Sequence, residues 1–201
     1  GVLWFGWFGF NAGSALSAGP LAALALFTTQ VATGAGAISW VLAEWKIQGK
    51  PTTLGAASGA VAGLVAITPA AGFVSPLSAI LIGLVAGVLC YLAVLAKAKI
   101  GYDDALDVVA VHGIGGLWGA LATGLFASTA ANPAGVNGLF YGNPHQFVVQ
   151  AIGAGSAIVY SLIISFIILK AIDLVVGLRV ETEDEVQGLD VTEHREVGYT
   201  M

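Results

Sequence analysis

The stretch PLSAILIGLVAGVLCYLAVLAKA, residues 76–98, holds no charged side chain before Lys97. A helix of about 20 apolar residues is long enough to cross the hydrocarbon core of a bilayer, so this stretch predicts a membrane-spanning helix. By the same criterion we expect six segments, at about 1–16, 21–45, 53–71, 76–98, 104–127 and 147–176. The transmembrane region would then cover residues 1–177, and residues 178–201 would form a tail.

The composition of the whole chain supports a membrane protein. Of its 201 residues, 57% are hydrophobic and 9% are charged, and the mean hydropathy is +0.89. Soluble domains carry about 25% charged residues. The single cysteine, Cys90, excludes an internal disulfide and a cysteine-based metal cluster, and no basic run suggests nucleic acid. We expect an all-α membrane protein, a polytopic helical bundle, without a cofactor or a metal ion.

The distribution of positive charge predicts how the segments are oriented. All Lys and Arg side chains fall in three places, at alternate connections and the adjoining segment ends or toward the C-terminus, namely Lys46, Lys50, Lys97, Lys99, Lys170, Arg179 and Arg195. Cytoplasmic loops carry an excess of Lys and Arg, so these connections and the C-terminal tail are predicted to be cytoplasmic. Glycines recur every four residues at Gly55, Gly59 and Gly63, at Gly83 and Gly87, and at Gly115 and Gly119. Such stripes indicate close contacts between helices.

A single histidine lies within the apolar stretch VVAVHGIGGLWGAL, residues 108–121. On a continuous helix from residue 104, His112 would lie roughly 13 Å from the cytoplasmic end, close to the bilayer midplane. An ionisable group at that depth should face protein or a cavity. Gly116 and Gly119 follow on the same helical face, so we expect space for a small solute beside the ring. The alternative is a hydrogen-bonded core histidine.

Two further groups of residues, one acidic and one aromatic, are candidates for a structural or a binding role. Asp103, Asp104 and Asp107 open the same segment and are expected to act structurally, as an N-cap with acidic first-turn residues. In GVLWFGWFGFNAGSAL, residues 1–16, Trp7, Phe10 and Ser14 fall on one helical face. An aromatic ring with a hydroxyl could receive a small cation. Packing or an interfacial aromatic belt would also explain the aromatic residues.

Four blocks of sequence resemble the ammonium transporter/Rhesus family, most closely its microbial ammonium transporter branch. They are GWFGFNAGSA (6–15), EWKIQGKPTTLGAASGAVAGLVAITPAAGFV (44–74), DDALDVVAVHGIGGLWGALATGLFA (103–127) and DLVVGLRVETEDEVQGLDVTEHREVGY (173–199). The resemblance implies a fold of about eleven helices built from inverted repeats, of which this chain would be the second half, helices six to eleven. It also implies a homotrimer in the plasma membrane, with one narrow pore in each subunit.

The resemblance also implies roles for individual residues. His112 matches the second of two pore histidines, Phe10 the inner of two gating phenylalanines, Ser14 the hydroxyl of the external recruitment site, and Trp7 a tryptophan lining the pore. The implied function is transport of ammonium or ammonia, with a PII-type regulatory protein as a partner on the cytoplasmic face. An ammonium sensor or a Rhesus-like channel for NH3 or CO2 are the alternatives. An enzyme is not expected, because no nucleophile, metal cluster or cofactor motif accompanies His112.

Overall fold

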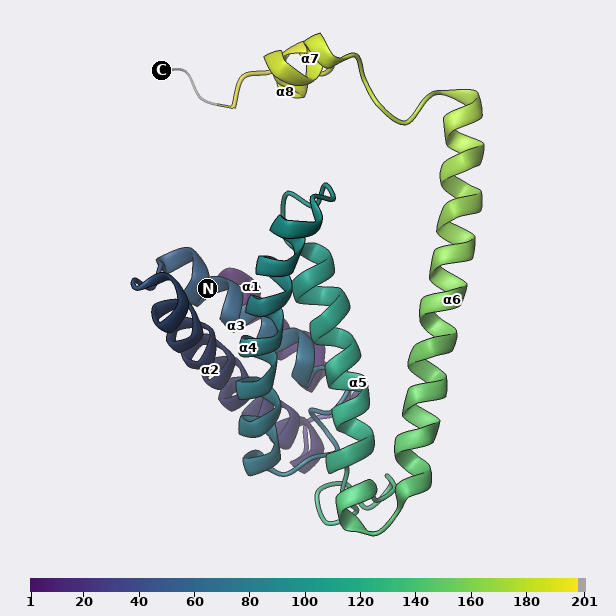
Figure 1. Cartoon of the computed structure of the whole chain (residues 1–201). Helices are drawn as coiled ribbons and strands as arrows, with labels where there is room; N and C mark the ends of the chain where they lie inside the picture. The colour runs from purple at the N-terminus through teal and green to yellow at the C-terminus, as the bar shows by residue number, and fades with distance from the viewer. Residues whose placement is uncertain (199–201) are drawn as a thin grey trace. The chain divides into compact units, whose positions relative to one another are not determined.

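The computed structural model describes residues 1–198, and the regular structure within them is helical throughout, as predicted. Figure 1 shows the helices in chain order. They are α1 (Val2–Gly13), α2 (Pro20–Gln48), α3 (Thr53–Ile67), α4 (Pro76–Ile100), the π-helix η1 (Val109–Ile114), α5 (Gly115–Phe126), the 3₁₀ helix η2 (Leu139–Tyr141), α6 (Pro144–Val175), α7 (Thr182–Gln187) and α8 (Leu189–Thr192).

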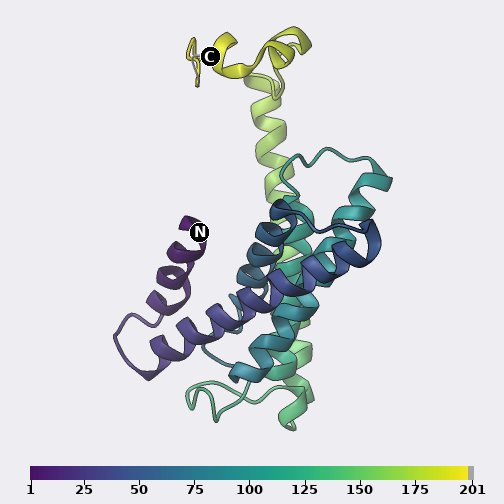
Figure 2. The same ribbon diagram turned by 90° about the vertical axis from the view of Figure 1, so that its left-hand side faces the viewer.

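The chain divides into two units, Gly1–Ala154 and Gly155–Met201, which we describe separately. In the first unit α1 to α5 form a bundle in which consecutive helices run in opposite directions (Figure 1). Helix α2 crosses the bundle obliquely and packs against both α3 and α4 (Figure 2). The lysine-bearing ends of α2 and α4 lie at the same end of this unit, as the alternating charge pattern predicts (Figure 1).

Four helical stretches in the described residues are long and apolar enough to cross a membrane. They are α2, α4, the combined stretch Val109–Phe126, and α6. Helix α1 has 12 residues and α3 has 15, which is shorter than the roughly 20 needed for a full crossing. Six crossings therefore stay a prediction for the segments around these two helices.

Local sequence signals explain where the long helices begin and end. Pro20 and Pro76 are the first residues of α2 and α4, where a missing N–H costs least. The hydroxyl of Ser75 accepts a hydrogen bond from the Ser78 amide and caps α4. Gly49 and Gly101 end the two helices with φ of +83° and +80°, a backbone conformation that glycine adopts without strain.

The glycine stripes are contact lines between helix backbones, which confirms that prediction. A Cβ atom built on Gly36 of α2 would lie 2.6 Å from the Gly59 carbonyl oxygen of α3. A Cβ on Gly63 of α3 would lie 2.5 Å from the Ala32 carbonyl oxygen of α2. The core around these contacts is dominated by alanine. Helices can approach this closely only where neither carries a side chain, so the bundle is held by backbone proximity.

Buried hydroxyls on α2 donate hydrogen bonds within their own helix. Thr28, Thr29 and Thr33 are fully buried. The hydroxyl of Thr29 donates to the Ala25 carbonyl at 2.6 Å, and that of Thr33 donates to the Thr29 carbonyl at 2.6 Å. Thr28 lies 2.9 Å from the Leu24 carbonyl oxygen and also 2.6 Å from the Ala71 carbonyl oxygen, beyond the end of α3. These bonds keep polar groups satisfied in an apolar core.

A buried carboxylate connects the end of α2 to the start of α3. Glu44 is 6% exposed. Its carboxylate accepts hydrogen bonds from the backbone N–H and the hydroxyl of Thr52, each at 3.0 Å. The Thr52 oxygen in turn accepts from the Gly55 amide at 2.8 Å. The positive end of the α3 dipole thus meets a negative charge, which stabilises both.

The second unit contains the greater part of α6, followed by α7 and α8. Its ion pairs lie close together in sequence: Lys170 with Asp173 at 3.1 Å and Arg179 with Glu185 at 2.8 Å. Both pairs are solvent exposed and add little stability. The large apolar side chains of α6 are also exposed, as they would be on a helix that contacts lipid or another protein.

Candidate functional site

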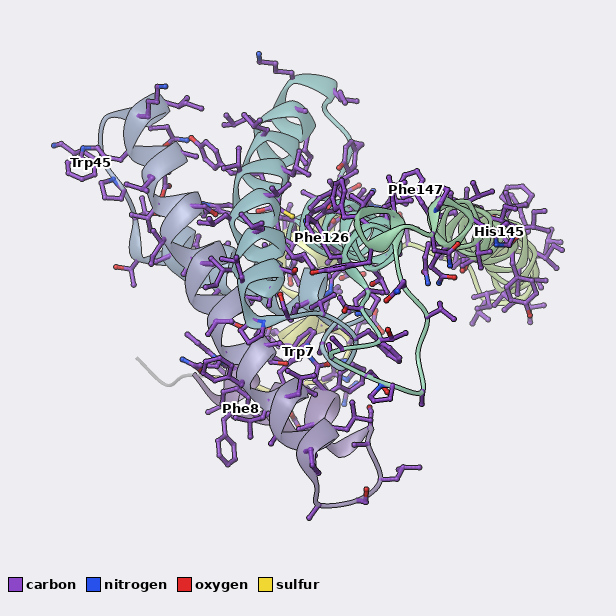
Figure 3. All side chains as sticks on the ribbon, turned by 90° about the horizontal axis from the view of Figure 1, so that it is seen from below. Trp7, Phe8, Trp45, Phe126, His145 and Phe147 are labelled. Carbon is purple, nitrogen blue, oxygen red and sulfur yellow. The ribbon has the colours of Figure 1, made fainter. Side chains whose placement is uncertain are left out.

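The aromatic face of α1 is fixed against the bundle by one tryptophan. The rings of Trp7 and Phe10 meet edge to face, with 5.8 Å between centroids. The Trp7 indole N–H donates a hydrogen bond of 2.8 Å to the Thr68 hydroxyl, and that hydroxyl donates to the Leu64 carbonyl at 2.8 Å. Figure 3 places Trp7 over the interior of the bundle and Trp45 at its rim. The orientation of the Trp7 ring is therefore set by α3.

Phe10 and Ser14 line a cavity of about 310 Å³, which we call the entrance cavity. Its other walls come from α2, from the turns after α3 and from Asn132 in the connection to α6. Ser14 is exposed, and its hydroxyl donates a 2.6 Å hydrogen bond to the Phe10 carbonyl. Because its proton is committed to the backbone, the oxygen keeps lone pairs for a donor in the cavity.

Asn11 is a wall residue of the entrance cavity that the sequence analysis did not single out as a site residue. It is 8% exposed, and its amide nitrogen donates a 2.9 Å hydrogen bond to the Thr29 hydroxyl on α2. This bond joins α1 to α2 directly beneath the cavity. The sequence marks Asn11 only as a polar residue within an apolar segment, and that pattern does not distinguish a cavity wall from a buried hydrogen bond.

His112 lies within the π-helix η1, between Val109 and Ile114. In this unit its side chain is exposed, whereas its neighbour Val111 is buried among the side chains of α2, α3 and α4. Both interpretations of His112, a pore residue and a hydrogen-bonded core residue, stay predictions. Single π-turns inside α-helices occur frequently at functional sites. The sequence gives no sign of this one, because hydrophobic periodicity does not distinguish a local π-turn.

The glycine strip that we expected beside His112 is not open. A Cβ on Gly119 would collide with the backbone of Ala66, and a Cβ on Gly116 would touch Val65 at 3.8 Å. Helix α3 therefore fills the space along this face of α5, and that prediction was wrong. Gly113, next to the histidine, has only Val109 of its own turn within 4 Å. The open space next to His112 thus lies at Gly113 and not along α5.

The three aspartates precede the helix instead of lying in its first turn. The regular structure begins at Val109 and not at residue 104, so a depth for His112 based on a continuous helix does not apply. Both carboxylate oxygens of Asp104 accept backbone N–H bonds of 2.9 Å, from Val108 and Val109, as a cap does. Asp107 forms an ion pair with Lys97 at the end of α4. Asp103 is exposed.

The structure brings only some of these residues together. Phe10 and Ser14 share the entrance cavity, and Trp7 is joined to it through its contact with Phe10. Trp7 also packs against the buried cluster that contains Val111, the residue before His112. His112 itself is not a wall of the entrance cavity. The described residues hold no group of three or more His, Cys, Asp or Glu side chains that could bind a metal ion.

Comparisons with known proteins all match one family. Residues 1–199 match the family described as "Ammonium Transporter Family". The "Ammonium transporter" of Bacillus subtilis is 51% identical over 199 residues, which is 98% of this chain and 49% of that protein. The crystal structure of Saccharomyces cerevisiae Mep2 superposes with a TM-score of 0.83 at 35% identity, covering 90% of this chain and 44% of that one.

A structure described as "Sensor Amt Protein" also matches, with a TM-score of 0.83 at 32% identity over 95% of this chain and 46% of that one. The chain spans about half the length of the curated relatives it matches.

Proposed function

This chain belongs to the ammonium transporter family, and from that premise we propose that it forms part of a membrane protein that carries ammonium or ammonia through a narrow pore in each subunit. The observation that supports this most directly is the entrance cavity. It combines the exposed Phe10 ring with a Ser14 oxygen that is free to accept a hydrogen bond. A donor-only cation is the ligand that such a site favours.

The low polarity of the bilayer favours a pore in which the charged ion binds at the entrance and the neutral molecule crosses the midplane. A bare cation is costly at the membrane midplane, whereas neutral ammonia is not. We propose that Ser14 recruits the hydrated ion, that Phe10 gates the way inward, and that Trp7 lines the path beyond. Ammonium then gives up one proton, leaving ammonia, and His112 takes part in receiving that proton. Imidazole suits this step because each of its ring nitrogens can accept or donate a proton.

The proposal extends to the surroundings of the complete protein. We place it in the plasma membrane as a homotrimer with a cytoplasmic C-terminal tail. A PII-type protein would bind the cytoplasmic face, at loops 46–52 and 97–103 and at the tail. The lysines at the ends of α2 and α4 support this orientation, because positive charge is retained on the cytoplasmic side.

The first experiment changes the histidine. His112→Ala in the complete protein, reconstituted in proteoliposomes, should alter the uptake rate of labelled methylammonium or its selectivity over other small cations. His145→Ala is the matched control, because it removes the same ring from an exposed position at the start of α6. Uptake and selectivity that match those of the unchanged protein in the His112 variant would refute the role.

The second experiment separates gating from assembly. Phe10→Ala removes an exposed ring that packs edge to face with Trp7. We expect altered uptake with an unchanged elution volume of the trimer on a sizing column. Loss of the trimer would show that Phe10 acts in packing instead.

A sensor is the second candidate, because the protein described as a sensor matches 95% of this chain. Sensing requires binding at the entrance cavity but no passage. Saturable binding of methylammonium together with no uptake into proteoliposomes would favour the sensor over the transporter.

A further inference from the structure

The π-turn that carries His112 lies between two fixed ends. On its C-terminal side, Gly115 begins α5 and packs against the Cys90 sulfur, where a Cβ would lie at 3.1 Å. Inside the turn, Val111 is 5% exposed within the cluster formed by α2, α3 and α4, and the N-terminal end of the turn follows Asp107. A π-turn accommodates one residue more than an α-helix between the same ends. The direction of every side chain in the turn then depends on where that extra residue is placed.

The upstream end is held by a network centred on two aspartates. Asp104 accepts the amide hydrogens of Val108 and Val109 at 2.9 Å, so it satisfies the first donors of the helical stretch. Lys97, in the last turn of α4, donates a 2.7 Å hydrogen bond to the Asp104 carbonyl and forms an ion pair with Asp107. The Asp107 carbonyl accepts from the Val111 amide at 2.9 Å. His112 is the next residue.

The backbone of Asp107, at the centre of this network, has an unusual conformation. Its φ is +55°, in the left-handed region that residues other than glycine rarely adopt. Aspartate and asparagine tolerate this region better than most residues, because their short polar side chains bond locally. The left-handed residue turns the chain out of the loop and into η1. Lys97 and Asp107 are 18% and 34% exposed, so their pairing is partly shielded from solvent.

We propose that Lys97, Asp104 and Asp107 are positioning residues that fix the register of η1 and thereby aim the His112 ring. This rests on the proposed function, in which His112 handles a proton. If the network is broken, the extra residue can be redistributed and η1 can relax toward an α-helix. Moving the register by one residue rotates a helical side chain by about 100°, which would turn the ring away from its path.

The kinetic signature separates positioning from recruitment. The entrance cavity is built from α1, α2 and the turns after α3, whereas the network lies at the opposite end of the unit, where α4 ends (Figure 1). Breaking the network should therefore leave the half-saturating concentration of methylammonium unchanged and lower the maximal uptake rate. A displaced reactive group can cost about a hundredfold, so we expect a loss between ten- and about a hundredfold.

Two variants remove the charge and preserve the shape. Lys97→Met keeps the aliphatic stem, and Asp107→Asn keeps a side chain that tolerates a positive φ. Both remove the same contact, so the double variant should be no slower than the slower single one. Lys97→Arg should restore the rate, because it retains the charge and the donors. Lys99→Met is the matched control, since Lys99 is exposed in the same turn of α4.

The test measures methylammonium uptake by the complete protein in proteoliposomes, scaled to the amount of folded trimer. A reduced maximal rate with an unchanged half-saturating concentration in Asp107→Asn and Lys97→Met, with rescue by Lys97→Arg, supports the proposal. Full rates in both variants, while His112→Ala is impaired, overturn it and leave the proposed function standing. If His112→Ala itself has no effect, both fail. Should Lys97→Met not assemble, Asp107→Asn decides alone.

Discussion

Replacing Gly36 by alanine tests whether backbone contact holds α2 against α3. The added methyl carbon would lie 2.6 Å from the Gly59 carbonyl oxygen and 2.9 Å from the Gly63 Cα. Both neighbours are backbone atoms, so no side chain can rotate to make room. The two helices must therefore separate along their whole line of contact.

The size of the effect follows from that separation. Ordinary van der Waals contact with a Cβ begins at about 3.4 Å, so the contact with Gly59 must lengthen from 2.6 Å by about 0.8 Å. A gap of that order forfeits a quarter to a half of the attraction between facing atoms. Overpacking of this kind costs about 1–3 kcal/mol. The better helix propensity of alanine offsets less than about 1 kcal/mol of this destabilisation.

The chain supplies a control two residues away. Gly34 lies on the same helix, and a Cβ there would meet nothing within 4 Å. We would heat the complete protein in detergent and measure the fraction that survives as folded trimer by size exclusion. Gly36→Ala should lose the trimer at a clearly lower temperature, and Gly34→Ala should match the unchanged protein or exceed it. Equal stability of the two variants would mean that close backbone contact is not what holds α2 and α3 together.

Three further changes use the same heating assay. Glu44→Ala leaves the N–H and hydroxyl of Thr52 without their acceptor and should lower the stability by about 1–3 kcal/mol. If Glu44→Ala and Glu44→Gln melt at the same temperature, the result would argue against a stabilising charge at the start of α3. Thr28→Val keeps the volume but loses the hydrogen bond to the Ala71 carbonyl, for about 1 kcal/mol; an unchanged melting temperature would contradict this. Trp118→Phe removes a 3.0 Å bond to a carbonyl of α4 and should destabilise by at least about 1 kcal/mol, which a stabilised variant would disprove.

Properties that depend on neighbouring residues in sequence were predictable. The apolar segments 21–45, 76–98 and 147–176 correspond to the long helices α2, α4 and α6. The glycine stripes correctly indicated helix contacts. The spacing of Phe10 and Ser14 predicts that they share one face of α1, and both line the entrance cavity.

Properties that depend on tertiary contacts were not predictable. The sequence around Gly116 and Gly119 looks empty because glycine has no side chain, but the backbone of α3 occupies that space. Asp107, which precedes η1, has a positive φ and pairs with Lys97 of another helix, and neither feature can be read from the local sequence. Likewise Glu44 lies eight residues from Thr52, and only the folded connection brings them together.

The threonines of α2 bear on how the protein is made. Thr29 and Thr33 donate to carbonyls one turn earlier in their own helix, so their hydroxyls are already satisfied when α2 leaves the translocon alone. Thr28 can do the same with Leu24 until the Ala71 carbonyl arrives. Before its partner helices are in place, α2 can therefore lie in lipid without leaving these three hydroxyls unsatisfied.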